Sequence, residues 1–199
     1  ATADRSNGVI VEEAAQRLFD VTAIWDGGPE TVSRAWSTRL PAPFRLAHGK
    51  QSPITLFFER VELFGLHSHE KFVPNAVFAL PNEGVALFLR NLWATDGCIG
   101  LFKQGDKLAP RLYYSTSSRR LADDVAALLL RLGIKPVIRT AKKPGYRDNY
   151  HVAIEGKCGQ TAFCGSVGAL PCKQDGLNAV VAHHADRSMD PNTDVIPAE

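Results

Sequence analysis

From residue 81 onwards, the chain alternates between a segment typical of a helix and a pair of segments typical of strands. The first helix is predicted from Pro81 to Gly97, because Pro81 and Glu83 suit a first turn and glycine suits a helix end. A turn with Gly105 and Pro110 is predicted to separate the first two strands. The remaining elements predicted are strands at 98–103 and 111–116, a helix at 118–132, strands at 135–140 and 149–155, and a short helix at 160–167. This order constrains the fold to an α+β arrangement.

The front of the chain reads as a second, incomplete copy of this unit. Residues 9–25 resemble residues 121–139, since both combine an acidic, alanine-rich helical segment with a β-rich segment. Residues 31–40 take the place of the strand at 149–155. The segment 57–71 resembles 162–174, and the two end in Lys71 and Lys173 after a glycine and an apolar residue. Such self-similarity predicts two related halves, of which the first lacks its leading helix and two strands.

The predicted helix that ends at Gly97 is apolar on nearly all sides, so we expect it to be buried. It nevertheless ends in a carboxylate, Asp96. An aspartate before a glycine is most often only a turn residue, so Asp96 alone does not indicate a site. Tyr113 and Tyr114 are neighbours in a predicted strand, and the alternation of side chains places one of them in the core.

Composition is ordinary for a globular protein: 199 residues, 45% hydrophobic and 22% charged. No apolar segment approaches the roughly 20 residues of a membrane helix. The four cysteines have no CxxC spacing, which disfavours a zinc site and indicates a reduced, cytoplasmic setting. The chain opens on Ala1 and contains one methionine, so we expect it to be a piece of a longer protein.

Charge is unevenly distributed along the chain. The formal net charge is +2, but residues 97–160 hold 12 Lys or Arg and 5 Asp or Glu residues. A concentration of positive charge indicates a polyanionic partner, most simply nucleic acid. A solvated surface remains the alternative.

Three ordered segments resemble the LAGLIDADG (DOD-type) homing endonucleases found in inteins. "LRNLWATDG" at 89–97 corresponds to the nine-residue motif of that family, with Asp96 and Gly97 at its end. "HEKFVPNAVFALP" at 69–81 and "LLRLGIKPVI" at 129–138 resemble the blocks that precede and follow the second motif. The likeness covers residues 9–175 and is strongest to inteins of bacterial replicative DNA helicases.

The resemblance implies a fold of two pseudo-symmetric αββαββα halves and an endonuclease that cleaves double-stranded DNA. In the family, two motif helices bring two aspartates together to bind Mg²⁺, so Asp96 and Gly97 are the expected metal residues. Lys71 and, less closely matched, Lys173 are the expected catalytic lysines. The strands form a DNA-binding saddle, and the candidates for contacts to bases are Lys103, Arg111, Arg139, Lys142 and Arg147.

The chain departs from the family in its first half. No segment of residues 1–60 reads as an apolar helix ending in Asp-Gly, and we predict that Asp26 and Gly27 form a turn. We therefore expect weak or no cleavage by this chain alone. A second copy paired through the helix at 85–95, or the missing N-terminal part, would supply the other aspartate. The splicing residues of inteins are not found at either end of the chain.

These observations predict a division into an incomplete N-terminal half at 1–80, a LAGLIDADG half at 81–175 and a tail at 176–199. Two alternatives stay open. One is a non-catalytic DNA-binding module of the same fold, and the other is a degenerate intein remnant.

Overall fold

The computed structural model describes residues 4–28, 30–31, 35–142, 144–185 and 187–188. The chain divides into two compact units, which we call the front unit (Ala1–Gly65) and the back unit (Leu66–Glu199). Each unit is described by itself. Both contain helices and antiparallel strands, which confirms the predicted α+β class.

The front unit is a strand pair packed against a helix. Its elements are α1 (Arg5–Phe19), β1 (Ile24–Gly27), β2 (Trp36–Arg39) and α2 (Pro53–Arg60). Gly8 of α1 allows the close approach of the strands, because a Cβ there would lie 2.4 Å from the Trp25 ring. Ala15, Val21 and Ile54 form a small core. Asp26 and Gly27, predicted to form a turn, are instead the last two residues of β1 and pair with Ser37 and Trp36.

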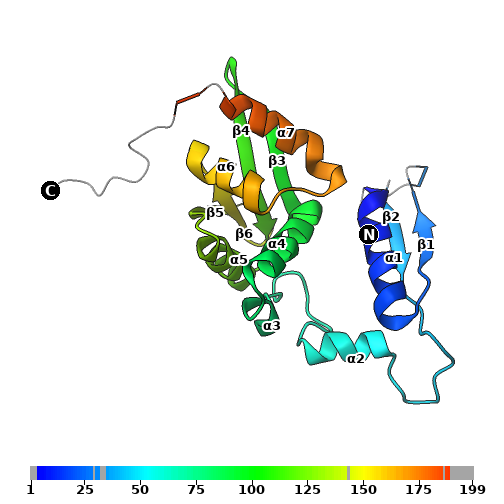
Figure 1. Ribbon diagram of the computed structural model, residues 1–199. Coiled ribbons are helices and arrows are strands. Elements are labelled where there is room, and N and C mark those ends of the chain that lie inside the picture. Colours follow the sequence, from blue (N-terminus) through cyan, green and yellow to red (C-terminus); the bar gives the residue numbers. More distant parts are fainter. Residues whose placement is uncertain (1–3, 29, 32–34, 143, 186, 189–199) are drawn as a thin grey trace. The chain divides into compact units, whose positions relative to one another are not determined.

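The back unit is one antiparallel sheet with helices on one of its faces (Figure 1). The sheet order is β3-β4-β6-β5. Its strands are β3 (Gly97–Gln104), β4 (Lys107–Thr116), β5 (Pro136–Ala141) and β6 (Asn149–Ile154). Its helices are α3 (Asn75–Phe78), α4 (Asn82–Asp96), α5 (Arg119–Arg131), α6 (Gly156–Ser166) and α7 (Pro171–Ala185).

The order of elements in the two units supports the predicted repeat. The front unit runs α1, β1, β2, α2, and the back unit contains the same order in α5, β5, β6, α6. The boundary between the compact units lies at Gly65, whereas the sequence suggested residue 80.

Two further local predictions were wrong, besides the turn at Asp26 and Gly27. Pro110 lies within β4, opposite Leu101, rather than in the turn. β6 pairs with β4 only from Tyr113 on, so at Pro110 one side of the strand has no neighbour in the sheet, and a proline is tolerated there. The segment 176–185, assigned to the tail, belongs to α7, where Leu177 and Val180 enter the core. The end of the predicted tail, 189–199, lies outside the described residues.

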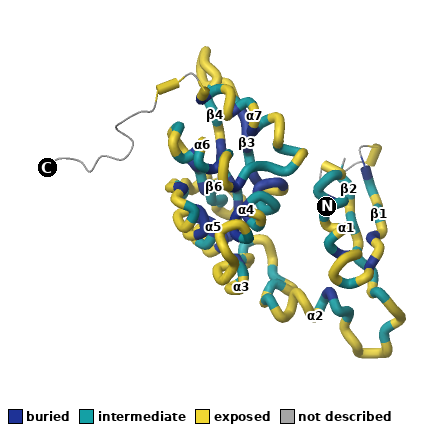
Figure 2. The backbone as a smooth tube through the Cα atoms, in the orientation of Figure 1, coloured by how far each residue is buried: buried dark blue, intermediate teal, exposed yellow. Residues whose placement is uncertain are grey.

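The core of the back unit lies between the sheet and the helices, as the dark blue segments in Figure 2 show. Trp93 of α4 is fully buried and packs against Tyr114 and Phe163, with ring centroids 5.6 and 4.9 Å away. We had expected α4 to be buried on all sides. It is not, because the sheet and the other helices cover only part of its surface. Leu87 on its uncovered face is 54% exposed.

Candidate DNA-contacting and catalytic surface

Asp96 and Gly97 mark an abrupt passage from α4 to β3. Gly97 is buried, and a Cβ on it would lie 2.4 Å from the carbonyl oxygen of Trp93. The Gly97 N–H donates to that same carbonyl and caps the helix. Asp96, one residue earlier, is exposed. The packing therefore requires a glycine at 97 and holds the Asp96 carboxylate at the surface, at the negative end of the helix dipole.

The Asp96 carboxylate interacts with two neighbouring residues, Thr95 and Tyr114. The Thr95 hydroxyl lies 3.4 Å from a carboxylate oxygen of Asp96. The pKa of Tyr114 is raised, first by burial and then by the negative charge of Asp96. Asp96 thus acts electrostatically on the sheet next to it.

Lys173 comes to the same end of α4 from the start of α7. The Cys172 sulfur approaches the Ala94 carbonyl oxygen at 3.9 Å, which places the first turn of α7 beside the last turn of α4. Burial raises the pKa of Cys98, while a hydrogen bond with Tyr113 and the charges of Lys173 and Arg111 act in the opposite direction. Lys173 therefore lies close to Cys98, two residues after Asp96.

Lys71 is fixed through its backbone rather than through its side chain. Its carbonyl oxygen accepts a hydrogen bond of 2.6 Å from Ser118, the residue that caps α5. Two residues later, the Val73 N–H donates to Asp124 at 2.9 Å. The Lys71 side chain is exposed. The structure thus anchors the segment that carries Lys71 to α5 and leaves the ammonium group facing solvent.

The described residues contain no group of three or more His, Cys, Asp or Glu side chains that could hold a metal ion. Asp96 offers one carboxylate and would need further ligands. Asp26 cannot be a second helix-end aspartate in this chain, because it lies in β1.

The second part of the surface is the face of the back-unit sheet that the helices leave uncovered, which we call the open face. In β4, Leu112 and Tyr114 are buried under the helices, so the alternating residues Arg111 and Tyr113 point to the open face. The pairing register carries this alternation across the sheet. The open face then includes Cys98, Phe102 and Gln104 of β3, Arg111, Tyr113 and Ser115 of β4, Asn149, His151 and Ala153 of β6, and Val137 and Arg139 of β5.

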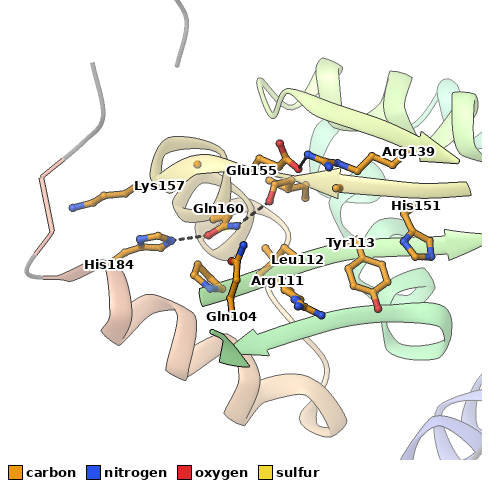
Figure 3. Close-up of a pocket in the computed structure, with 14 residues that line it drawn as sticks. Gln104, Arg111, Leu112, Tyr113, Arg139, His151, Glu155, Lys157, Gln160 and His184 are labelled. Carbon is orange, nitrogen blue, oxygen red and sulfur yellow. Dashed lines mark hydrogen bonds and ion pairs between the residues drawn. The ribbon is translucent and has the colours of Figure 1, made fainter. Parts of the chain in front are cut away.

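A groove of about 590 Å³ begins on this face and continues past the end of β6 to α6 and α7, where Lys157, Gln160 and His184 also line it (Figure 3). In it, the rings of Tyr113 and His151 stack with centroids 4.7 Å apart and planes 18° apart. The Arg111 guanidinium lies 5.4 Å from the Phe102 ring. Arg139 forms an ion pair of 2.5 Å with Glu155, just after β6. The groove therefore combines planar rings with cationic and hydrogen-bonding groups, which suits the edges and phosphates of a nucleic acid.

The structure brings only some of the predicted DNA-contacting residues together. Arg111 and Arg139 both line the groove. Lys103 follows the alternation of Ile99 and so points to the other side of the sheet, although it is exposed at the strand end. Lys142 and Arg147 are exposed beyond the ends of β5 and β6. Arg147 is close enough to Glu70 to help lower the pKa of that carboxyl, after the larger effect of a hydrogen bond from the His67 backbone.

The sequence did not single out Tyr113, His151, Gln104 or Glu155 as groove residues. The alternation within each strand was readable, but which strands lie side by side, and in which register, was not. Without that register, His151 and Tyr113 cannot be placed in contact.

Comparison with known proteins agrees with this architecture. Residues 83–168 match the family model of the LAGLIDADG-like domain. The chain is 43% identical over 169 residues to the replicative DNA helicase DnaB of Synechocystis, and 42% identical over 166 residues to that of Rhodothermus marinus. These matches cover 83% and 82% of this chain. A 139-residue match to the RecA protein of Mycobacterium tuberculosis is 29% identical and covers 61% of this chain and 17% of that protein.

The chain spans only about a fifth of the length of the DnaB relatives, 19% and 18%. Together, the domain match and the helicase matches confirm the resemblance stated from the sequence. Among the described residues, no helix is both long and apolar enough to cross a membrane.

Proposed function

We propose that this chain, whose residues 83–168 form a LAGLIDADG-like domain, is the DNA-binding and endonuclease domain of an intein in a DnaB-type helicase. The front unit would be its incomplete N-terminal half. The observation that carries the proposal is the packing of the first turn of α7, which holds Lys173, beside the last turn of α4, which ends in Asp96.

Double-stranded DNA would lie along the open face of the back unit. Arg111 forms no ion pair with an acidic side chain among the described residues, and its guanidinium lies over the Phe102 ring. Strand side chains of this kind reach base edges in the major groove, while exposed lysines and arginines contact phosphates. The groove residues would therefore position the duplex, with the scissile phosphates near the end of α4.

In the proposed reaction, Asp96 would provide one carboxylate oxygen for a divalent cation such as Mg²⁺. When bound, such a cation activates water and stabilises the leaving oxygen of a phosphodiester. Lys173 would offset the charge of the phosphate as it reacts, and Lys71 is the second candidate for this role. One aspartate does not form a paired site, so we expect weak or no double-strand cleavage by this chain alone.

The proposal is tested with the purified chain and a pool of random-sequence duplexes. Binding should weaken linearly in a plot of log K against log salt concentration, because each phosphate contact releases counterions. Cleavage in Mg²⁺ should be weak or absent. The Asp96→Asn variant should bind as tightly as the wild type in the absence of Mg²⁺, and so should the control Glu83→Gln, at the other end of α4.

The results separate the alternatives. Binding that does not depend on salt would contradict a DNA-binding role of either kind. Efficient cutting by the wild type that Asp96→Asn abolishes would confirm the endonuclease and refute the expected inactivity. Cutting that persists in Asp96→Asn would exclude the proposed role of this residue.

A further inference from the structure

Arg139 and Glu155 form an ion pair at the rim of the groove, at the end where β6 stops (Figure 3). Their side chains are 64% and 48% exposed. An ion pair so exposed to water contributes little to stability, at most roughly 1 kcal/mol. Folding alone therefore gives no strong reason for this pair.

Glu155 is also not needed to begin α6. It occupies the N-cap position of that helix, but its side chain makes no capping hydrogen bond. Its carboxylate instead turns to Arg139 on the neighbouring strand. The local helix chemistry thus leaves the carboxylate free for a role on the open face.

The sheet register explains how the two side chains meet. Arg139 is paired with His151, and the next pair on the same face is Val137 with Ala153. Ala153 is small, so the long side chain of Arg139 can lie along the sheet and reach Glu155 beyond the end of β6. The pair thereby joins β5 to the end of β6 and remains accessible to solvent.

The contact uses only part of each group. One guanidinium nitrogen, Nη2, donates to one carboxylate oxygen, Oε1. Among the described residues, the other guanidinium N–H groups of Arg139 and the second oxygen of Glu155 make no hydrogen bond. The pair therefore presents adjacent donors and an adjacent acceptor in the groove, next to the Tyr113 and His151 rings.

This pattern complements one base pair. In the major groove, a G·C pair presents two neighbouring acceptors, guanine N7 and O6, followed by a donor, cytosine N4. An A·T pair presents a donor, adenine N6, between two acceptors. Arginine matches the two guanine acceptors, and a glutamate beside it matches the cytosine donor.

We propose that Arg139 and Glu155 together read one G·C base pair of the DNA. This inference rests on the proposed function, since it requires duplex DNA on the open face. It assigns Glu155, an acidic residue in a basic region, to sequence recognition. Glu155 would also weaken binding at positions where it faces a phosphate or a thymine oxygen, and so increase discrimination.

The test is a selection of duplexes from a random-sequence pool by the full chain, followed by sequencing. The variants are Arg139→Gln and Glu155→Gln, which keep similar side-chain size and remove one charge each. The matched control is Arg119→Gln, which breaks another exposed arginine–carboxylate pair, with Asp123 on α5. Affinities are then measured for two duplexes that differ only by G·C against A·T at the position affected.

The wild type and Arg119→Gln should prefer the G·C duplex by roughly tenfold or more, as a well-formed base contact allows. Both groove variants should lose this preference at the same single position, and the double variant should lose no more than either one. The inference is overturned if both variants select the same DNA sequence as the wild type. It is also overturned if the wild type binds DNA in a salt-dependent way but prefers no sequence. Either result leaves the DNA-binding proposal standing. If the wild type retains no duplex at any salt concentration, both proposals fail.

Discussion

The buried glycine at position 97 lies against Trp93, four residues earlier in the chain, so closely that a Cβ would be 2.4 Å from the Trp93 carbonyl oxygen and from its ring. This contact lets α4 pass directly into β3 while Trp93 stays in the core. It also fixes where the Asp96 carboxylate leaves the helix. The pair connects the packing of the back unit with its candidate catalytic residue.

Gly97→Ala should destabilise the back unit by about 1–3 kcal/mol, because the new methyl group cannot fit without moving the backbone. The measurement is urea unfolding of the two proteins. Gly165→Ala is the matched control, since Gly165 lies in α6 and a Cβ there meets nothing within 4 Å. The control should be neutral or slightly stabilising, in line with the higher helix propensity of alanine. Equal stability of Gly97→Ala and the wild type would contradict the close contact.

Trp93 itself has an unusual feature: its indole N–H is buried and has no hydrogen-bond partner among the described residues. Trp93→Phe removes that unsatisfied donor and keeps an aromatic ring, so its cost should be small. Trp93→Ala should cost about 3–5 kcal/mol, because it opens a cavity beside Tyr114 and Phe163. Thermal unfolding of both variants measures the difference. A cost for Trp93→Phe as large as that for Trp93→Ala would show that the N–H has a partner in solution.

Ser118 couples the segment that carries Lys71 to α5. Its hydroxyl accepts from the Leu121 N–H at 3.1 Å and donates to the Lys71 carbonyl at 2.6 Å. Ser118→Ala should cost about 1–2 kcal/mol, as expected for a lost helix cap. It should also speed trypsin cleavage after Lys71. Ser52→Ala, which removes the cap of α2 in the front unit, should leave the rate of that cleavage unchanged. Identical rates in Ser118→Ala and the wild type would show that the bond does not hold this segment.

His184 should make stability depend on pH. It is 8% exposed, and it bonds to Gln160, whose amide donates to the Ile154 carbonyl. Burial lowers its pKa below the ordinary value of 6.5, and the charges of His183, Lys157 and Arg187 lower it further. The unfolded chain therefore binds the proton more readily, and stability falls as pH decreases through the unfolded value towards the lower folded one.

This prediction is checked by urea unfolding at pH about 7.5 and about 5.5, on either side of the ordinary histidine pKa. His184→Gln should reduce the loss of stability between the two values. His48→Gln, at an exposed position of the front unit, should not. A loss of equal size in His184→Gln and the wild type would assign the pH dependence to other groups.

Much of the back unit was predictable because its local signals agree with its packing. Pro81 and Gly97 bound α4, and Ser118 caps α5, as the sequence suggested. α7 was missed because its residues show almost no separation of apolar and polar faces. It is nevertheless helical, and Gly176 allows it to touch β3, since a Cβ there would lie 2.2 Å from the Ile99 carbonyl oxygen. Such a tertiary contact leaves no periodic signal in the sequence.

The candidate site also contains features that were predictable from the sequence and features that were not. Asp96 was identifiable from its motif, because the helix end and the glycine are local features. The proximity of Lys173 to Cys98 and the stacking of Tyr113 on His151 depend on strand register and helix packing. From the sequence, five basic residues were equally good candidates for contacts to DNA bases. In the structure, the alternation of side chains along the strands places Arg111 and Arg139 on the open face and Lys103 on the other side of the sheet.

The central claim is that duplex DNA lies on the open face, and the salt dependence of binding by Arg111→Ala tests it most directly. The wild-type plot of log K against log salt should be linear, and Arg111→Ala should bind DNA more weakly. If Arg111 contacts a phosphate, the slope for the variant should be smaller by about 1. If Arg111 contacts a base, the variant should instead show a weaker sequence preference. Arg119→Ala, on the helix-covered side, should match the wild type in both respects. Wild-type binding that Arg111→Ala leaves unchanged in affinity, slope and sequence preference would contradict the account.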